Sequence, residues 1–538
     1  MSNTARKKLV ETGMFCIILW LAGTRRAFAW KEASFQWAAR RRSGVHATGD
    51  AMDAERFMTW ASSNGVLAPG LELALLPSGQ KGMRASSALD GGRPVITAPH
   101  KLVLETTTLS RAPPPYLPSS WAAPDAWASA PWYVRLALML LYEKQRGASS
   151  PFLPWLRVLP TFEQFQACLP LHWTAAELDE LHYDPLLDAI EKQRTEYESY
   201  FNTCAATTGA TLEEFFWAIH CVRSRSFSGV YEGSVWEERA TQAGFTTLLA
   251  AGALAVGAAE PSQVLNGVLA VGVTTIMRDF LVSNSGGLRR YVLCPVVDMM
   301  NHRGSYAATV SYEYFSNSFS ATVSRPFNAG DEVCISYGER SNDQLLQFYG
   351  FTEVDNPNDQ YEIRSLLELV DAALPGGVPH GRLAQLKTAG LLDAVRTGTA
   401  TPTGFVDATR YAVRALVATD EEVKRAGGGA IGCSALANAA GSKAGLTGGQ
   451  DLDARVDSVL ATACMLELEA LPSSFGADFA ALKASQEAWE KKKKVSERFE
   501  LALHFRLEKK RVLKSCRVSC SEIDSDRESS MTKDQPNI

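Results

Sequence analysis

The fold is decided by residues 291–351, which read YVLCPVVDMMNHRGSYAATVSYEYFSNSFSATVSRPFNAGDEVCISYGERSNDQLLQFYGF. Apolar side chains at 292, 293, 296 and 297 predict a buried strand, because they form a short run bounded by polar residues. Alternation of apolar and polar residues over 307–314 and 319–323 then predicts a β-hairpin that turns at Ser316-Asn317.

A further strand and a short helix are predicted to complete this stretch. The turn-like sequence at 328–331 favours a strand over 332–337. Ser341 followed by Gln344 matches a capping box, so we expect a helix over 342–349. Gly350 is expected to end that helix, since glycine readily takes the left-handed conformation found at helix C-termini.

Five short motifs follow one another in this stretch. An Asn-His pair after a strand is more often an ordinary turn, and a tyrosine at a strand end usually only packs there, so the set carries the argument. The motifs are Asp298-x-x-Asn301-His302, Gly330-Asp331-Glu332-Val333, Ser336-Tyr337-Gly338, Arg340-Ser341-Asn342 and Tyr349-Gly350-Phe351. In this order they resemble the SET-domain methyltransferases, in particular the branch that includes the RuBisCO large-subunit lysine methyltransferase and the actin histidine methyltransferase.

The resemblance implies an α+β fold: a β-rich SET domain with a helical insert, followed by an all-α C-terminal substrate-binding domain. After a targeting presequence over 1–50, we expect the SET domain over 51–352, its helical insert at about 131–222 and an extra Ala/Gly-rich insertion at about 230–290. The helical domain is expected over 353–515 and a disordered tail over 516–538. Helical periodicity in the C-terminal half predicts helices over 363–373, 382–394, 404–418 and 477–515, with a glycine-rich loop at 426–450.

Composition limits the class of protein. With 538 residues, 46% hydrophobic and 21% charged, the chain has the composition of a globular protein of two or three domains. A net charge of -5 gives no sign of a nucleic-acid surface. The ten cysteines include no C-x-x-C pair, so we predict neither a metal site nor a disulfide framework, and we expect a reducing compartment.

The first 50 residues have the pattern of a targeting presequence. Arg6-Lys7-Lys8 precede an apolar run over 14–21, and Ala27-Phe28-Ala29 offers a small-residue cleavage site, as in a signal peptide. The basic, acid-poor segment that follows, with Arg40-Arg41-Arg42, resembles a transit peptide. A signal followed by a transit segment favours a plastid of secondary origin, with the cytoplasm or a membrane-associated state as the alternative.

The insertion at 230–290 has two uncharged runs, 240–259 and 261–277, rich in Ala, Gly, Val and Thr. They are long enough to reach across a bilayer or nearly so, but glycine disfavours an isolated helix. We predict a packed helical hairpin or a surface insertion, and keep membrane contact through 240–277 as the alternative.

The resemblance implies binding of S-adenosyl-L-methionine by two segments outside the deciding stretch. The glycine turn over 79–85 is expected to bring Lys81, Gly82, Met83 and Arg84 to the methyl donor, although Gln80 replaces an expected glycine. Arg225, beyond a predicted helix over 212–220, is expected at the donor's carboxylate, where a guanidinium binds two oxygens at once. The alternatives are a plain hairpin for the turn and, for Arg225, a charge that complements the helix dipole.

The remaining site residues also come from the resemblance. Asn301, His302 and Tyr337 are expected to hold the donor. Tyr337 is also expected to align the acceptor amine with the methyl group as the catalytic residue, and Asp298 and Tyr349 to shape the acceptor channel. Asp298 could instead only cap the turn that follows it. A lysine acceptor has a reference pKa of about 10.4, and desolvation beside a sulfonium ion would lower that pKa enough for the amine to lose its proton.

The predicted function is S-adenosylmethionine-dependent N-methylation of a lysine in a non-histone protein that docks on the C-terminal helical domain of a monomer. Methylation of a protein histidine is a second possibility, since the same branch does both. The third is a catalytically degenerate SET fold that serves as a binding scaffold. Gln80, Gly229 in place of a family arginine and the long insertion motivate that reading.

Overall fold

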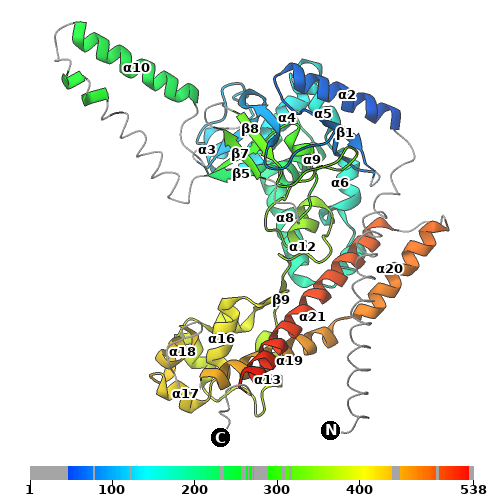
Figure 1. Cartoon of the computed structure of the whole chain (residues 1–538), viewed down its shortest axis with the longest axis vertical. Coiled ribbons are helices and arrows are strands. Elements are labelled where there is room, and N and C mark those ends of the chain that lie inside the picture. The colour runs from blue at the N-terminus through cyan, green and yellow to red at the C-terminus, as the bar shows by residue number, and fades with distance from the viewer. Residues whose placement is uncertain are drawn as a thin grey trace. The chain divides into compact units, whose positions relative to one another are not determined.

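The computed structural model describes residues 47–76, 79–108, 110–121, 123–230, 236–255, 262–264, 266–268, 271, 289–304, 309–313, 318–438, 449–491 and 496–531. The chain divides into two compact units, one from 1–162 and 197–338 and the other from 163–196 and 339–538 (Figure 1). Residues 1–46 of the predicted presequence and the turn at Ser316-Asn317 lie outside the described residues.

The first unit combines three small antiparallel sheets with helices. The sheet orders are β1-β2, β3-β8-β7 and β4-β6-β5, so β6 lies at the centre of its sheet. The strands are β1 Leu71–Leu75, β2 Lys81–Ala85, β3 Pro94–Pro99, β4 Leu104–Thr107, β5 Phe227–Val230, β6 Arg289–Leu293, β7 Thr309–Glu313 and β8 Ser318–Thr322. The helices are α2 Ala47–Ser63, α3 Pro124–Ser129, α4 Trp132–Gln145, α5 Leu153–Val158, α9 Leu212–Arg225 and α10 Trp236–Ala255.

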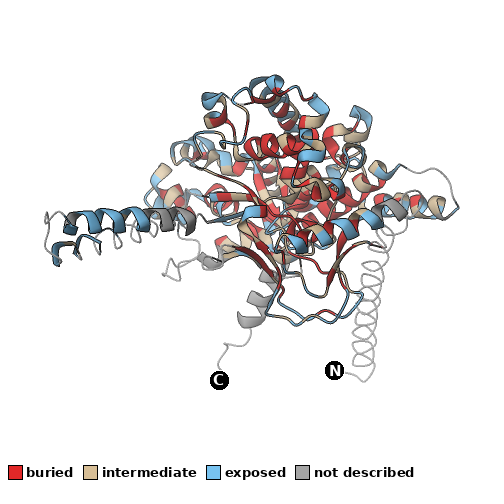
Figure 2. Ribbon diagram, turned by 90° about the horizontal axis from the view of Figure 1, so that it is seen from above, coloured by how far each residue is buried: buried red, intermediate tan, exposed pale blue. Residues whose placement is uncertain are grey.

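The core of this unit follows from the apolar patterns of its elements. Helix α4 is apolar on nearly every side, and its residues 134–141 are all buried against α9, β4 and β6. In β1, the alternate residues Leu71 and Leu73 face the interior. Buried residues accordingly fill the interior, as the red segments in Figure 2 show.

Within 291–351 the predicted hairpin and helix are present. The two other predicted strands, over 292–297 and 332–337, are not formed as predicted. Strands β7 and β8 pair antiparallel as predicted, and α12 Asn342–Tyr349 begins after Ser341 and ends at Gly350, whose φ is 75°. The strand predicted through 297 was wrong in its second half, because the chain leaves the sheet at Leu293 and Pro295 cannot donate to a ladder.

The strand predicted over 332–337 is also not a regular strand. This segment changes partner halfway: Val333 N donates to Met83 O (2.8 Å), and Ile335 N donates to Asn301 O (2.9 Å). Each partner provides only an isolated bridge, so no continuous ladder forms. Sequence alternation detects an extended chain but not a change of partner.

The second unit is mainly helical and carries one small sheet, β11-β10-β9, that we did not predict. Its strands are β9 Tyr361–Ile363, β10 Gly398–Thr401 and β11 Gly404–Phe405. Its helices are α6 Phe162–Cys168, α7 Ala175–Asp179, α8 Asp184–Tyr200, α12, α13 Leu366–Ala373, α14 Arg382–Thr388, α15 Leu392–Arg396, α16 Asp407–Val417, α17 Asp420–Arg425, α18 Gly429–Asn438, α19 Gly449–Ala470, α20 Phe475–Glu490 and α21 Glu497–Met531.

Four predictions for this unit need correction. The helix predicted over 382–394 is split into α14 and α15 at Gly390, whose φ of 71° breaks the helix. The predicted glycine-rich loop contains α18, and the single helix predicted over 477–515 is two helices, α20 and α21. The tail predicted to be disordered is helical to Met531, and buried Cys516 and Cys520, one turn apart, extend the packed face of α21 as far as Cys520; residues 532–538 lie outside the described residues.

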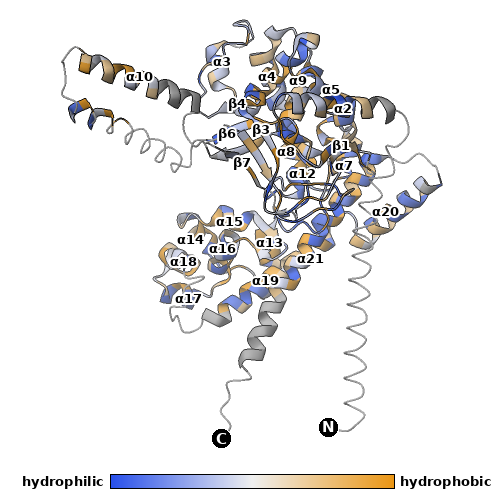
Figure 3. Cartoon of the chain, turned by 45° about the horizontal axis from the view of Figure 1, so that its top comes forward, coloured by the Kyte–Doolittle hydropathy of each residue, from blue (hydrophilic) through white to orange (hydrophobic). Residues whose placement is uncertain are grey.

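Helix α10 is the described part of the extra insertion with the most regular structure. It is largely apolar, as the orange segments in Figure 3 show. Phe245, Leu248 and Leu249 are 63%, 72% and 58% exposed, so these side chains are not packed as the predicted hairpin would require. Within the described part of the chain, no helix combines the length and hydropathy needed to cross a bilayer.

Candidate active site

The segment 298–302 is placed by an unusual turn after β6. Val296, a buried β-branched residue, has φ 76° and ψ -50°, which are the dihedral angles of a strained γ-turn. The short 3-10 helix η6, Val297–Met299, follows at once, and Asp298 N donates to Cys294 O (3.0 Å). The chain therefore turns sharply out of the sheet where the polar motif begins.

Asp298 is buried, with a side chain that is 0% exposed. Trp155 Nε1 donates to its Oδ2 (3.0 Å), and Arg225 Nη1 lies 3.9 Å from the same oxygen. Burial raises the pKa of Asp298 to about 6, although Arg225 and the Trp155 hydrogen bond oppose that rise. Asp298 is thus a carboxyl group whose charge state changes near neutral pH.

Arg225 is the last residue of α9, which begins in a capping box formed by Thr211 and Glu214. Its Nη1 donates to the backbone oxygen of Asp298 (2.6 Å). Its Nε is buried and has no hydrogen-bond partner in the described part of the molecule. The guanidinium therefore has a donor left for a ligand, such as the carboxylate of a methyl donor.

Glu332, Lys81 and Tyr337 contact the segment 298–302 on the side of Asn301 and His302. Asn301 Nδ2 donates to Glu332 Oε1 (2.8 Å) and to Lys81 O (3.3 Å). Tyr337 N donates to His302 Nδ1 (3.0 Å), and the Tyr337 hydroxyl donates to Met300 O (3.0 Å). The rings of His302 and Tyr337 lie 5.0 Å apart.

Strand β2 approaches this motif closely. A Cβ atom on Gly82 would lie 2.6 Å from Asn301 Nδ2 and 2.5 Å from Leu76 Cδ1, so a larger residue here would have to displace these side-chain ends. Met83 is fully buried, and its carbonyl accepts from Val333. The backbone of this strand therefore lies directly beside the Asn301 side chain, and donor binding by the glycine turn stays a prediction.

The predicted site residues fall into two groups. The structure brings together Lys81, Gly82, Met83, Arg225, Asp298, Asn301, His302 and Tyr337, all through the segment 298–302 or β2. Arg84 is on β2 but pairs with Glu72 (2.8 Å), not with another predicted site residue. Tyr349 belongs to the second unit, where it ends α12 and its ring contacts Phe351.

Two contributors were missed at the sequence level. Trp155 orients Asp298, and Glu332 orients Asn301. The signal for Trp155 was weak: a buried tryptophan normally needs an acceptor for its N–H, but nothing in the sequence says which one. Glu332 lies inside a quoted motif, yet its partner is 31 residues away along the chain. No group of His, Cys, Asp or Glu side chains in the described residues is arranged to hold a metal ion.

Comparison with known proteins supports the predicted resemblance, although no family model matches the chain. The actin-histidine N-methyltransferase of Drosophila melanogaster is 27% identical over 335 residues, which cover 59% of this chain and 52% of that protein. SET domain-containing protein 4 of Homo sapiens is 22% identical over 303 residues, covering 56% and 58%. N-lysine methyltransferase SETD6 of Homo sapiens is 33% identical over 87 residues, covering 16% and 18%. The chain thus spans little more than half the length of the first two relatives.

Solved structures confirm the predicted fold class. The SET domain of LSMT bound to methyl-lysine and AdoHcy matches with a TM-score of 0.52 at 16% identity, covering 87% of this chain and 91% of that one. Rubisco LSMT bound to AdoMet matches with a TM-score of 0.51 at 16% identity, covering 88% and 92%. The chain therefore has the SET-domain fold, and its sequence is similar to those of SET-domain methyltransferases.

Proposed function

We propose that this chain is an S-adenosylmethionine-dependent protein methyltransferase that acts on a lysine of a non-histone protein. The observation that carries the proposal is that Arg225, Tyr337 and the β2 backbone at Lys81 all contact one five-residue segment, 298–302, which contains Asn301. These residue types could hold the carboxylate and polar groups of a donor molecule. The sequence relatives include an actin-histidine and an N-lysine methyltransferase, so the same site with a histidine acceptor is the second candidate.

The residues would hold S-adenosyl-L-methionine, which supplies the electrophilic methyl group when it is bound. Arg225, whose Nε–H has no partner among the described residues, would bind the donor's carboxylate, and the Lys81–Met83 backbone beside Asn301 would border the donor. The Tyr337 hydroxyl donates a hydrogen bond to Met300 O, and a hydroxyl oxygen that donates can also accept an N–H from the acceptor amine. Such positioning is the main contribution a protein can make to a direct transfer.

Transfer of label from the donor tests this proposal. Purified protein is incubated with labelled S-adenosylmethionine and an extract, and the modified residue is identified by mass spectrometry. We propose the plastid as the location, so a plastid extract is the first source of substrate. Tyr337→Phe should bind the donor normally but transfer about 100-fold more slowly, because one positioned hydroxyl is lost. Tyr116→Phe, at a tyrosine that is 45% exposed, is the matched control.

Two results would redirect the proposal. If calorimetry with millimolar donor gives no heat of binding, the scaffold interpretation replaces the enzyme interpretation. If label appears on histidine, the acceptor assignment changes while the site assignment stands. Equal rates for the parent and Tyr337→Phe would remove the catalytic role from Tyr337.

A further inference from the structure

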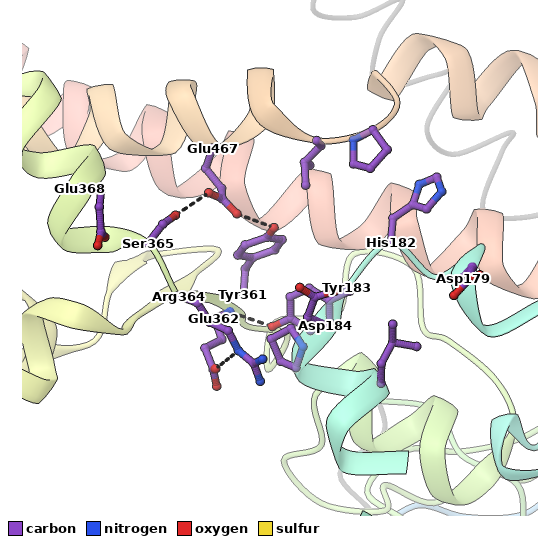
Figure 4. A pocket seen from close by; sticks show the side chains of 14 residues that line it. Asp179, His182, Tyr183, Asp184, Tyr361, Glu362, Arg364, Ser365, Glu368 and Glu467 are labelled. Atoms are coloured by element: carbon purple, nitrogen blue, oxygen red, sulfur yellow. Dashed lines mark hydrogen bonds and ion pairs between the residues drawn. The ribbon is translucent and has the colours of Figure 1, made fainter. Parts of the chain in front are cut away.

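A cavity of about 610 Å³ opens in the second unit, away from any residue assigned above. It is lined by the end of α7, the start of α8, β9, the first turn of α13 and the end of α19 (Figure 4). Its volume lies in the range of ligand pockets, and Pro185, Leu187, Leu471 and Pro472 supply apolar walls. The cavity is therefore large enough for several side chains of a partner.

The lining is strongly acidic. It contains the carboxylates of Asp179, Asp184, Glu362, Glu368 and Glu467 and a single guanidinium, that of Arg364. Arg364 is already engaged, since it pairs with Glu362 (3.0 Å) and with Asp188 (2.7 Å) outside the lining. Burial, together with Arg506, lowers the pKa of His182, so its imidazole is neutral at pH 7 and adds no positive charge.

Glu467 is held in place without a counter-ion. The Tyr361 hydroxyl donates to Glu467 Oε1 (2.8 Å), and Ser365 Oγ donates to Oε2 (3.5 Å), as the dashed lines in Figure 4 show. Burial and then the neighbouring Glu467 carboxylate raise the pKa of Tyr361, so this phenol stays protonated and keeps donating. Glu467, Glu368 and Asp184 form no ion pair with any described residue, so the cavity offers fixed negative charge.

The Tyr183 hydroxyl adds a second kind of contact. Its side chain is 6% exposed, and its oxygen accepts from Glu362 N (2.8 Å). Burial raises the pKa of this phenol, so it keeps its proton, yet that proton has no acceptor among the described residues. A buried donor without an acceptor favours a ligand that also presents an oxygen, as a peptide backbone does.

We propose that this cavity is the docking site for a basic segment of the protein substrate, a peptide that places lysine or arginine side chains against Glu467, Glu368 and Asp184. The proposal rests on the proposed function, because it assumes that the partner is the protein to be methylated. The cations pair with the fixed carboxylates, their methylene stems lie along the proline and leucine walls, and a peptide carbonyl accepts from Tyr183.

Binding of a fluorescein-labelled tetra-lysine peptide to the full chain, without methyl donor, tests the site. The pocket variant is Glu368→Gln with Glu467→Gln, in which glutamine still accepts from Tyr361. The matched control, Glu421→Gln with Glu469→Gln, changes the net charge equally on exposed residues outside the cavity. We expect the pocket variant to bind at least about tenfold more weakly and the control to bind like the parent.

Hydrogen exchange provides a readout that needs no variant. Tetra-lysine should protect peptides that cover 361–368 and 467–472 of the parent. Equal loss of binding in both variants would show attraction to net charge alone and overturn the proposal, as would absence of binding or of this protection in the parent. Binding at the pocket without methyl transfer to any extract protein would instead overturn the proposed function and leave the cation site intact.

Discussion

At the scale of single residues, the candidate site depends on polar groups that are buried and already oriented. Asp298 receives a hydrogen bond from Trp155 and lies beside Arg225, and Tyr337 is held by the carbonyl of Met300. A buried charge keeps its orientation but costs stability unless it is fully paired. The cost at Asp298 is visible in its raised pKa.

This cost predicts a pH-dependent effect of Asp298→Asn. The folded protein holds the Asp298 proton up to about pH 6, whereas the unfolded chain releases it near pH 4, so this group lowers the parent's stability as pH rises between these values. Asparagine does not titrate. The variant should therefore gain stability relative to the parent, on the order of 3 kcal/mol between pH 4 and pH 7.

Urea denaturation at pH 4.5 and pH 7.5 measures this difference. Asp393→Asn is the control, because that side chain is 99% exposed and should show almost no pH-dependent change. The stability difference between Asp298→Asn and the parent should differ between the two pH values. An equal difference at both would contradict the raised pKa of the buried Asp298 carboxyl group.

At the scale of elements, the site is a crossing of short extended segments rather than a feature of one sheet. Strand β2 and the segment 301–303 each take part of the chain at 332–337 as a partner. Such a crossing requires backbones to approach closely, and Gly82 is where β2 meets the side chain of Asn301. The close packing of β2 against Asn301 therefore depends on residue 82 having no side-chain methyl group.

We expect Gly82→Ala to weaken binding of S-adenosylmethionine by at least about tenfold, because the added methyl group must displace Asn301 or Leu76. The backbone of Gly82 needs no left-handed conformation, so the effect is steric. Gly229→Ala is the matched control, since a Cβ there meets no atom within 4 Å. Calorimetric titration with the donor compares the two, and equal affinities would show that β2 does not border the donor site.

At the scale of the whole molecule, one buried ionic cluster joins distant parts of the second unit. The second unit contains a buried lysine, Lys509, whose side chain is 3% exposed. Its ammonium group contacts the carboxylates of Asp343 and Asp359 and the carbonyl of Gln360. Lys509 thereby joins α21 to α12 and to the loop before β9. Both of these segments lie more than a hundred residues before α21 along the chain.

Lys509→Met should destabilise the second unit by about 3–5 kcal/mol, since it leaves the buried carboxylate of Asp359 and the partly buried carboxylate of Asp343 without their cation. Hydrogen exchange should show the loss as weaker protection of peptides from α12 and α21. Lys387→Met, at an exposed lysine of α14, should leave protection unchanged. Unchanged protection in Lys509→Met would mean that these carboxylates are protonated or hydrated in the native protein.

Much of this protein could be predicted from its sequence, because the informative patterns are local. The ends of α12 follow from Ser341 and Gly350, and the β7–β8 pair follows from alternation over a short stretch. Motif order predicted the fold class and, within the candidate site, Asp298, Asn301, His302 and Tyr337. What the tertiary structure alone decided is non-local: the turn at Val296, the partner change within 332–337, and the contacts of Trp155 and Glu332. Those features depend on which distant group meets a given backbone or side chain, and no local pattern of apolar and polar residues records that choice.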